Sequence, residues 1–148
     1  MDRSRTIGIG AFGLTSFLLL LVASCGYVAS GTWNDEDENW ERAFGAELPD
    51  GVELVHSHFW RGAHFTHEAV YYFELAPNAE FERELTQSGE YELHFSWSDP
   101  EPVAPSWFSP AVAVDDFEIW APVGAEFDGS RFYIERETRR IFLHDSQL

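Results

Sequence analysis

Four histidines lie within twelve residues and are followed at once by a glutamate, in the series His56, His58, His64, His67 and Glu68. On a β-strand, His56 and His58 point to the same side, about 6.5 to 7 Å apart along the strand. A second strand folding back would bring His64 or His67 towards them. Three imidazoles and a carboxylate suit Zn²⁺ or Cu²⁺. We therefore predict a metal site at His56, His58, His64 and His67. The alternative is structural or surface histidines, because the spacing matches no metal motif.

An aromatic pair, Trp107 and Phe108, lies between Pro105 and Pro110. The prolines restrict the backbone on both sides of the pair. If the two side chains are exposed, they form a platform for a protein partner or a glycan. If they are buried, they plug one end of the core. Trp107 and Phe108 are thus the predicted partner-binding residues, with the core plug as the alternative.

The remaining reactive side chains do not form a recognisable catalytic set. The chain has no Gly-x-Ser-x-Gly motif. Asp115, Asp116 and Glu118 form a carboxylate cluster, but adjacent residues on a strand point to opposite faces and cannot share a substrate. We therefore expect a protein that is not an enzyme and has no cofactor.

Four arginines gather near the end of the chain, at positions 131, 136, 139 and 140. They could receive an anionic partner. The neighbouring Glu135 and Glu137 favour ordinary surface ion pairs instead, which contribute little to stability.

The first 24 residues have the layout of a secretory signal. Arg3 and Arg5 precede an apolar stretch from Ile7 to Val22, and small residues follow. The next residue, Cys25, is the only cysteine. A single exported cysteine cannot form an internal disulfide.

The segment Val22-Ala23-Ser24-Cys25 resembles the lipobox of bacterial lipoproteins. The resemblance implies cleavage before Cys25, a diacylglyceryl group on its thiol, and acyl chains such as palmitate that anchor the protein in a membrane. Two or more acyl chains hold a protein stably on a bilayer. Because Gly26 and not Asp follows, the resemblance favours the outer membrane if the cell has one.

Two alternatives to the lipid anchor remain open. The apolar run can be extended from Ile7 to Ala29, which is 23 residues. About 20 are needed to span a bilayer, so the segment could be an uncleaved helix. The chain could also be a soluble secreted product. All three place the remainder in the cell envelope or beyond, facing away from the cytoplasm, because Arg3 and Arg5 favour the cytoplasmic side.

The residues after the signal form a strongly acidic chain. Removing residues 1–24 leaves 7 arginines and 25 acidic residues, a formal charge of −18, and there is no lysine. Such a surface repels nucleic acid and anionic head groups, so we expect neither as a partner. An envelope protein is the expected partner, and the membrane is reached only through Cys25.

The pattern of apolar residues predicts the elements that position these side chains. A short helix begins in the acidic cluster 34–38 and ends at Gly45, and a second runs from Asn78 to about Gln87. Strands are predicted at 52–60, 67–75, 91–97 and 112–120, followed by a hairpin over 131–145. In that hairpin, Ile134 pairs with Leu143.

We therefore predict an α+β fold, an antiparallel sheet of about six strands with one or two α-helices packed on one face. The expected organisation is a signal peptide at 1–24, a lipidated N-terminus and tether at 25–32, and a single domain at 33–148. Its expected role is that of a non-enzymatic binding or structural module. The alternative is a metal- or small-ligand-binding domain built on His56 to Glu68.

Overall fold

The computed structural model describes residues 30–62, 68–94, 104–124 and 130–147. The predicted signal peptide and Cys25 lie outside the described residues, as do His64 and His67. None of the helices in the described ranges is both long enough and apolar enough to cross a bilayer.

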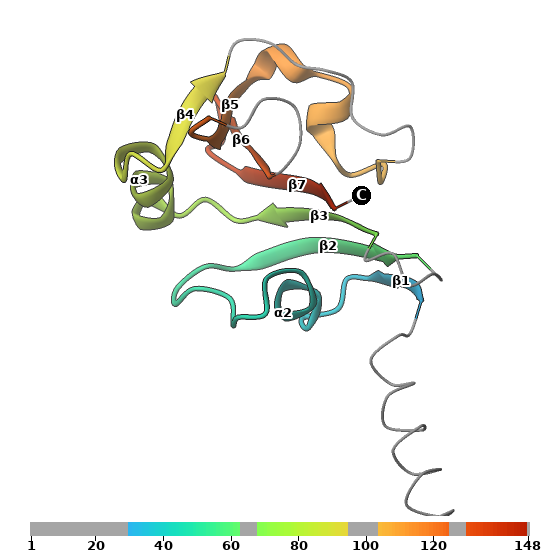
Figure 1. The fold of residues 1–148 in the computed structure, drawn as a ribbon. Helices are drawn as coiled ribbons and strands as arrows, with labels where there is room; N and C mark the ends of the chain where they lie inside the picture. The colour runs from blue at the N-terminus through green and yellow to red at the C-terminus, as the bar shows by residue number, and fades with distance from the viewer. Residues whose placement is uncertain (1–29, 63–67, 95–103, 125–129, 148) are drawn as a thin grey trace, which may run out of the picture.

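The described chain forms a seven-stranded sheet in which every pair of neighbouring strands is antiparallel. The sheet is strongly twisted, with β1 at one edge and β4 at the other (Figure 1). Its spatial order is β1 (Gly31–Asn34), β2 (Leu54–Arg61), β3 (Ala69–Leu75), β7 (Ile141–Gln147), β6 (Arg131–Glu135), β5 (Phe117–Pro122) and β4 (Tyr91–His94). The predicted antiparallel α+β architecture is thus confirmed, with seven strands instead of about six.

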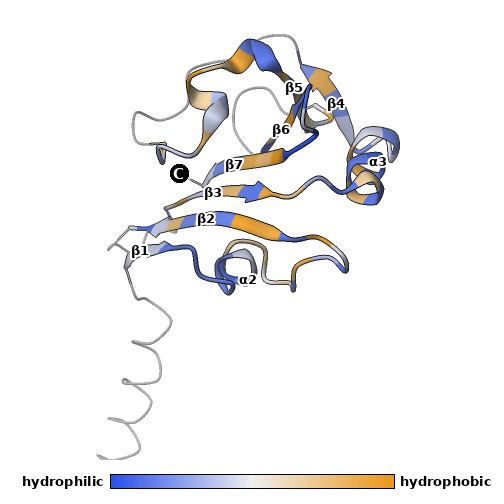
Figure 2. Ribbon diagram, turned by 180° about the vertical axis from the view of Figure 1, so that it is seen from behind, coloured by the Kyte–Doolittle hydropathy of each residue, from blue (hydrophilic) through white to orange (hydrophobic). Residues whose placement is uncertain are grey.

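Two α-helices pack on one face of the sheet. They are α2 (Asn39–Phe44), which lies beside β2, and α3 (Ala79–Gln87), which lies near β4 (Figure 1). Trp40 of α2 and Leu85 of α3 are buried in the same apolar cluster as Phe73 and Leu143. Figure 2 shows hydrophobic stretches along the central strands and a mainly hydrophilic α2. Both short helices therefore depend on this contact with the sheet for their stability.

The segment from Ala104 to Asp116 covers part of the opposite face. It contains two 3₁₀ turns, η2 (Ser109–Ala111) and η3 (Val114–Asp116). Phe108 is fully buried against Tyr72, Tyr133 and Phe142 from three strands. The sheet therefore has an apolar cluster on each side.

The helix α3 begins and ends where the sequence predicted, whereas α2 ends at Gly45 as predicted but begins only at Asn39, after the acidic cluster 34–38. Gly45 ends α2 in the left-handed conformation, with φ of 66°, and its N–H donates to the Glu41 carbonyl. The Asn78 side chain caps α3 by accepting hydrogen bonds from the N–H groups of Glu80 and Phe81. A capping Asn of this kind stabilises a helix by about 1 kcal/mol.

The strand β1 was not predicted, and the sheet begins two residues before the expected domain boundary at 33. The sequence analysis placed Gly31 and Thr32 in the tether and Asn34 in the acidic cluster that begins the first helix. The pairing of β1 with β2, with Trp33 opposite Phe59, makes the segment a strand. The two rings pack with centroids 5.8 Å apart. Tertiary packing thus overrides weak local propensity.

A β-bulge at Val55 changes the face of β2 on which the residue before it lies. Leu54 pairs with Leu75 and His56 with Glu74, so Val55 has no partner in the register. The extra residue reverses the side on which Leu54 lies. Leu54 therefore packs in the helix-side cluster, whereas unbroken alternation along the predicted strand 52–60 would place it on the face of His56 and His58.

The predicted strand 112–120 begins too early. Residues 114–116 form η3, and β5 starts at Phe117. Asp115 and Asp116 are therefore in a 3₁₀ turn and not on a strand, so the argument that they point to opposite faces of a sheet does not apply. Aspartate is disfavoured in strands.

The terminal hairpin has a different register from the predicted one. Ile134 pairs with Ile141, and Phe132 pairs with Leu143. Glu135 N–H donates to the Arg140 carbonyl and closes a four-residue loop, in which Arg139 has a φ of 59°. The register differs by two residues, so the same side chains still share one face.

Candidate functional site

The strand β2 places His56, His58 and Trp60 on the face away from the two helices. The residues between them, Ser57 and Phe59, are buried on the helix side. This alternation follows from the period of two in a strand, and it holds from His56 onwards because the bulge lies before it. As predicted, His56 and His58 lie on the same face of one strand.

His56 is held between a carboxylate and an indole. Its Nδ1 lies 3.0 Å from Oδ1 of Asp35, and its ring stacks on that of Trp107 with centroids 5.3 Å apart at 21°. The hydrogen bond with His56 holds the pKa of the Asp35 carboxyl below its usual value. Asp35 itself is fixed in the left-handed conformation, because its N–H donates to the Ser57 carbonyl.

His58 is fixed in a similar way by its opposite residue on β1. Its Nδ1 lies 2.6 Å from Oδ1 of Asn34. Burial lowers the pKa of His58, so its imidazole is neutral at pH 7. An amide oxygen can only accept, so Nδ1 of His58 carries the proton and Nε2 presents a lone pair.

The aromatic pair between the prolines is divided between the core and the surface. Phe108 is 1% exposed, so it plugs the core, which was the alternative interpretation, and offers no surface to a partner. Trp107 is only half-buried and lies over His56. The backbone that positions them is a turn in which the Phe108 N–H donates to the Pro105 carbonyl.

We call His56, His58, Trp60 and Trp107 the histidine–tryptophan surface. Trp60 is 37% exposed, and the His56 side chain is 40% exposed. Sequence analysis had treated the histidines and Trp107 as separate candidates. The contact between His56 and Trp107 unites them, because the segment 104–108 crosses the sheet to reach β2.

The predicted metal site is only half described. Two of its four ligands, His64 and His67, are outside the described residues. Within the described ranges, no group of three or more His, Cys, Asp or Glu side chains is arranged to hold a metal ion. Metal binding by His56 and His58 together with these residues stays a prediction.

His144 of β7 is a buried histidine that the sequence patterns did not single out. Its ring stacks on Tyr72 with centroids 4.6 Å apart. Burial lowers its pKa to about 4, so the imidazole is neutral at pH 7. The available signal was its position two residues after Phe142, on the same face of the strand.

Three of the four clustered arginines form ion pairs with glutamates that are distant in sequence. Arg140 pairs with the buried Glu74 at 2.9 Å, and Arg139 pairs with Glu82 of α3. Both Arg136 and Arg139 lie 3.7 Å from Glu118. The expected surface pairing is therefore observed, although Glu74, Glu82 and Glu118 take the place of the neighbouring Glu135 and Glu137. These pairs tie the hairpin loop to α3, β3 and β5.

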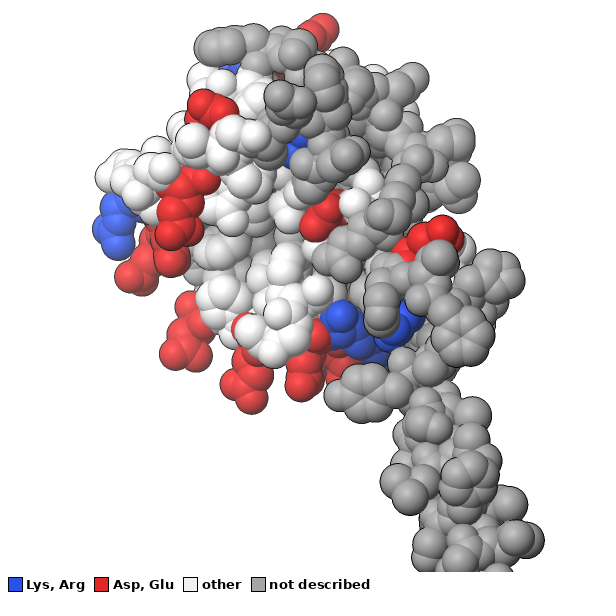
Figure 3. Space-filling model, viewed as in Figure 1, with Lys and Arg blue, Asp and Glu red and all other residues white. Residues whose placement is uncertain are grey.

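Among the charged side chains visible in Figure 3, the acidic ones predominate, and they follow the sides on which α2 and α3 lie in Figure 1. This agrees with the formal net charge of −17 for the whole chain.

Comparison with family models, with curated proteins and with solved structures finds no match to this chain.

Proposed function

We propose that this chain is a cell-envelope lipoprotein, anchored through Cys25, whose α+β domain is a non-enzymatic module that binds another envelope protein. The single observation that carries the binding role is the half-exposed Trp107 stacked on His56. An aromatic side chain already held by its neighbours loses little conformational entropy on binding, and such residues often dominate interface energetics.

A binding role fits the surroundings of His56 better than catalysis does. His56 and Asp35 form a hydrogen-bonded pair, as an imidazole base and its orienting carboxylate do in hydrolases. The adjacent hydroxyl of Ser57, however, is buried and donates to the Glu36 carbonyl. It is therefore turned away from the role of a nucleophile for this pair.

The acidic surface supports a partner that carries positive charge near its contact region. Opposite charges steer two proteins together and raise the association rate at low salt. Nucleic acid and anionic lipid head groups do not suit a domain of this charge. The proposed location is the outer membrane if the cell has one.

Capture from the native envelope tests the binding role. Full-length wild type, Trp107→Ala and Val112→Ala are each expressed in the source cell, cross-linked and recovered. The partner protein captured in this way is then purified. We expect it to bind wild type and Val112→Ala equally, and Trp107→Ala at least about tenfold more weakly. Val112 is the matched control because it is 88% exposed and lies outside the histidine–tryptophan surface. Equal binding by all three proteins would contradict the proposal.

A second function is metal binding by the histidine segment, which one observation favours. Nδ1 of both His56 and His58 is engaged by a side-chain oxygen, which is the usual arrangement for a histidine that binds metal through Nε2. Zn²⁺ and Cu²⁺ titration of wild type, His58→Ala and His67→Ala tests it. Loss of binding in both variants supports a site that spans the segment, and unchanged binding refutes it.

A further inference from the structure

The strand β1 begins, and its partner β2 ends, at the same end of the sheet. Gly31, the first residue of β1, pairs with Arg61, the last residue of β2, and β1 is an edge strand. Ser30, which precedes β1, is exposed. The chain from Cys25 therefore joins the domain here. We call Gly31, Trp33, Trp60 and Arg61 the tether end of the sheet.

The proposed anchor at Cys25 limits the distance between the tether end and the membrane. A chain extends by at most about 3.6 Å per residue, so the five steps from Cys25 to Ser30 span no more than about 18 Å. An uncleaved helix that ends at Ala29 would bring Ser30 closer still. Either anchor therefore holds the tether end beside the bilayer.

Two tryptophan rings lean towards the tether end. A Cβ atom at Gly62 would lie 3.4 Å from the Trp60 ring, and one at Gly31 would lie 3.1 Å from the Trp33 ring. Each indole thus extends along its strand towards the point where the chain from Cys25 joins. Trp60 is 37% exposed and Trp33 is half-buried. Tryptophan is enriched at membrane–water interfaces, because its ring is apolar and its N–H binds polar groups.

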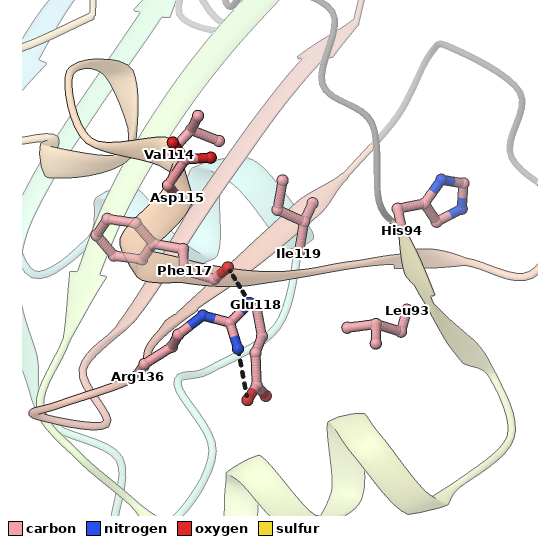
Figure 4. A pocket seen from close by; sticks show the side chains of 8 residues that line it. All are labelled: Leu93, His94, Val114, Asp115, Phe117, Glu118, Ile119 and Arg136. Carbon is pink, nitrogen blue, oxygen red and sulfur yellow. Dashed lines mark hydrogen bonds and ion pairs between the residues drawn. The ribbon is translucent and has the colours of Figure 1, made fainter.

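Arg61 supplies a cation at the tether end. Within the described part of the chain, it takes part in none of the ion pairs. Arg136, by contrast, is already engaged at the pocket beside β5, where Figure 4 shows its side chain linked to the Phe117 carbonyl and to Glu118. A guanidinium donates readily to phosphate oxygens. Arg61 is therefore available to a phospholipid head group.

The charges around the tether end favour a zwitterionic lipid over an anionic one. Glu68 lies beside Gly62 at this end, and Figure 3 shows acidic as well as basic side chains on the side where β1 lies in Figure 1. The chain as a whole is strongly acidic, so a bilayer with negative surface charge would repel it. A zwitterionic phospholipid offers a phosphate to Arg61 without that surface charge.

We propose that the tether end rests in the head-group region of a zwitterionic bilayer. Trp60 and Trp33 lie at the interface, and Arg61 donates hydrogen bonds to lipid phosphates. This contact rests on the proposed anchoring of the chain in a membrane. His56 lies four residues before Trp60, about 13 Å along β2. The bilayer thus takes Trp60, while His56 and Trp107 remain for the protein partner, which is met close to the membrane surface.

Quenching of tryptophan emission by brominated lipid tests this contact. Full-length protein with its anchor is reconstituted in phosphatidylcholine vesicles whose acyl chains are brominated close to the head groups, where bromine quenches indoles at short range. We expect wild-type emission to fall relative to unbrominated vesicles. In Trp60→Phe the fall should be smaller by about half, because the more exposed of the two interfacial indoles is removed.

Trp107→Phe is the matched control for Trp60→Phe. Trp107 is also a partly exposed indole on the face away from the two helices, but it lies over His56 and outside the tether end. Its replacement should leave the quenched emission as large as in wild type. Both variants keep an aromatic ring, so a difference between them reports where each indole lies.

Arg61→Glu tests the phosphate contact separately. The introduced carboxylate repels lipid phosphates, so the quenching should again fall by about half. Arg83→Glu is the matched control, because Arg83 is exposed and pairs with Glu80 on α3, away from the tether end. Both substitutions change the net charge equally, and Arg83→Glu should be quenched as strongly as wild type.

Three results would overturn the proposal. If the vesicles hold wild type but Trp60→Phe loses no quenched emission, the anchor stands and the tether end does not meet the bilayer. Equal quenching of Arg61→Glu and Arg83→Glu would show that no phosphate contact exists. If the vesicles do not hold wild type at all, the proposed anchor fails and the membrane contact fails with it.

Discussion

The imidazole of His56 stacks on the indole of Trp107, with ring centroids 5.3 Å apart and an interplanar angle of 21°. The two residues come from separate parts of the chain, β2 and the proline-rich segment that covers the sheet. Because Asp35 holds Nδ1 of the same imidazole, the indole rests on a ring that is itself fixed. Trp107 is thus a supported surface residue and not a loose loop side chain.

Removing the indole should be visible at His56. In Trp107→Ala, the ring protons of His56 lose the shielding of the stacked indole and move downfield in a ¹H–¹³C spectrum of histidine-labelled protein. The resonances of His144, which stacks on Tyr72, should stay in place and serve as the internal control. Unmoved His56 resonances would mean that the two rings do not stack in solution.

Phe108→Ala should destabilise the domain strongly. The side chain is 1% exposed and contacts the rings of Tyr72, Tyr133 and Phe142. Truncation leaves a cavity and costs about 3 to 5 kcal/mol in the free energy of unfolding, measured by urea denaturation. The exposed Val112→Ala should change it by no more than about 0.5 kcal/mol. A small loss at Phe108 would show that segment 104–116 is not part of the cooperative fold.

Asn39→Ala should reveal a buried polar network that ties α2 to the sheet. Asn39 is fully buried, and its Nδ2 donates to the Trp33 carbonyl and to Oγ of Ser57 at 3.2 and 3.0 Å. Its loss leaves buried groups without a hydrogen bond and should cost about 2 to 3 kcal/mol on unfolding. Glu41→Gln, an exposed change on the same helix, is the control. Equal stability of the two variants would refute a structural role for Asn39.

His144 should make stability depend on pH. Burial lowers its pKa from 6.5 to about 4, so the unfolded state binds the proton more tightly than the folded state. The stabilisation is therefore complete above about pH 6.5 and is lost as the pH falls towards 4, by on the order of 3 kcal/mol in total.

Replacement of this histidine isolates its contribution. His144→Phe should flatten the dependence of the unfolding free energy on pH between 7 and 5, measured by urea denaturation at each pH. The window stops at pH 5 because carboxylates titrate below it. Parallel curves for wild type and His144→Phe would show that His144 is not buried as a neutral group.

Cys25→Ser should release the protein from membranes after cell fractionation, because the proposed acyl chains would have no thiol to attach to. A matched Ser24→Ala change keeps a small residue before Cys25 and should leave the protein in the membrane fraction. If Cys25→Ser also stays in that fraction, the segment from Ile7 to Ala29 anchors the chain as an uncleaved helix.

The local parts of the fold were predictable from sequence. Asn78 marks the start of α3 and Gly45 marks the end of α2, because a capping side chain and a left-handed glycine act over a few residues. The antiparallel sheet followed from short connections between alternating strands. The position of His56 and His58 on one face followed from the period of two.

The parts that depend on distant contacts were not predictable. The strand β1 exists because Trp33 packs on Phe59, and Leu54 turns inward because of a bulge against β3. The alternating pattern of a strand does not encode which neighbour it meets or where an extra residue enters the ladder. The hairpin register was missed for the same reason, because a shift of two residues preserves every face.

The sequence by itself determined the chemical inventory: a single cysteine, Cys25, in a segment that resembles a lipobox, a pair of histidines on one strand face, a tryptophan between prolines, and an acidic chain. Only the tertiary structure decided which of these meet. It buried Phe108, left Trp107 half-exposed over His56, and brought Trp33 and Trp60 to one end of the sheet. Residue types and local periodicity are properties of short segments. The approach of two side chains from distant segments depends on how the sheet twists and on which connections cross it.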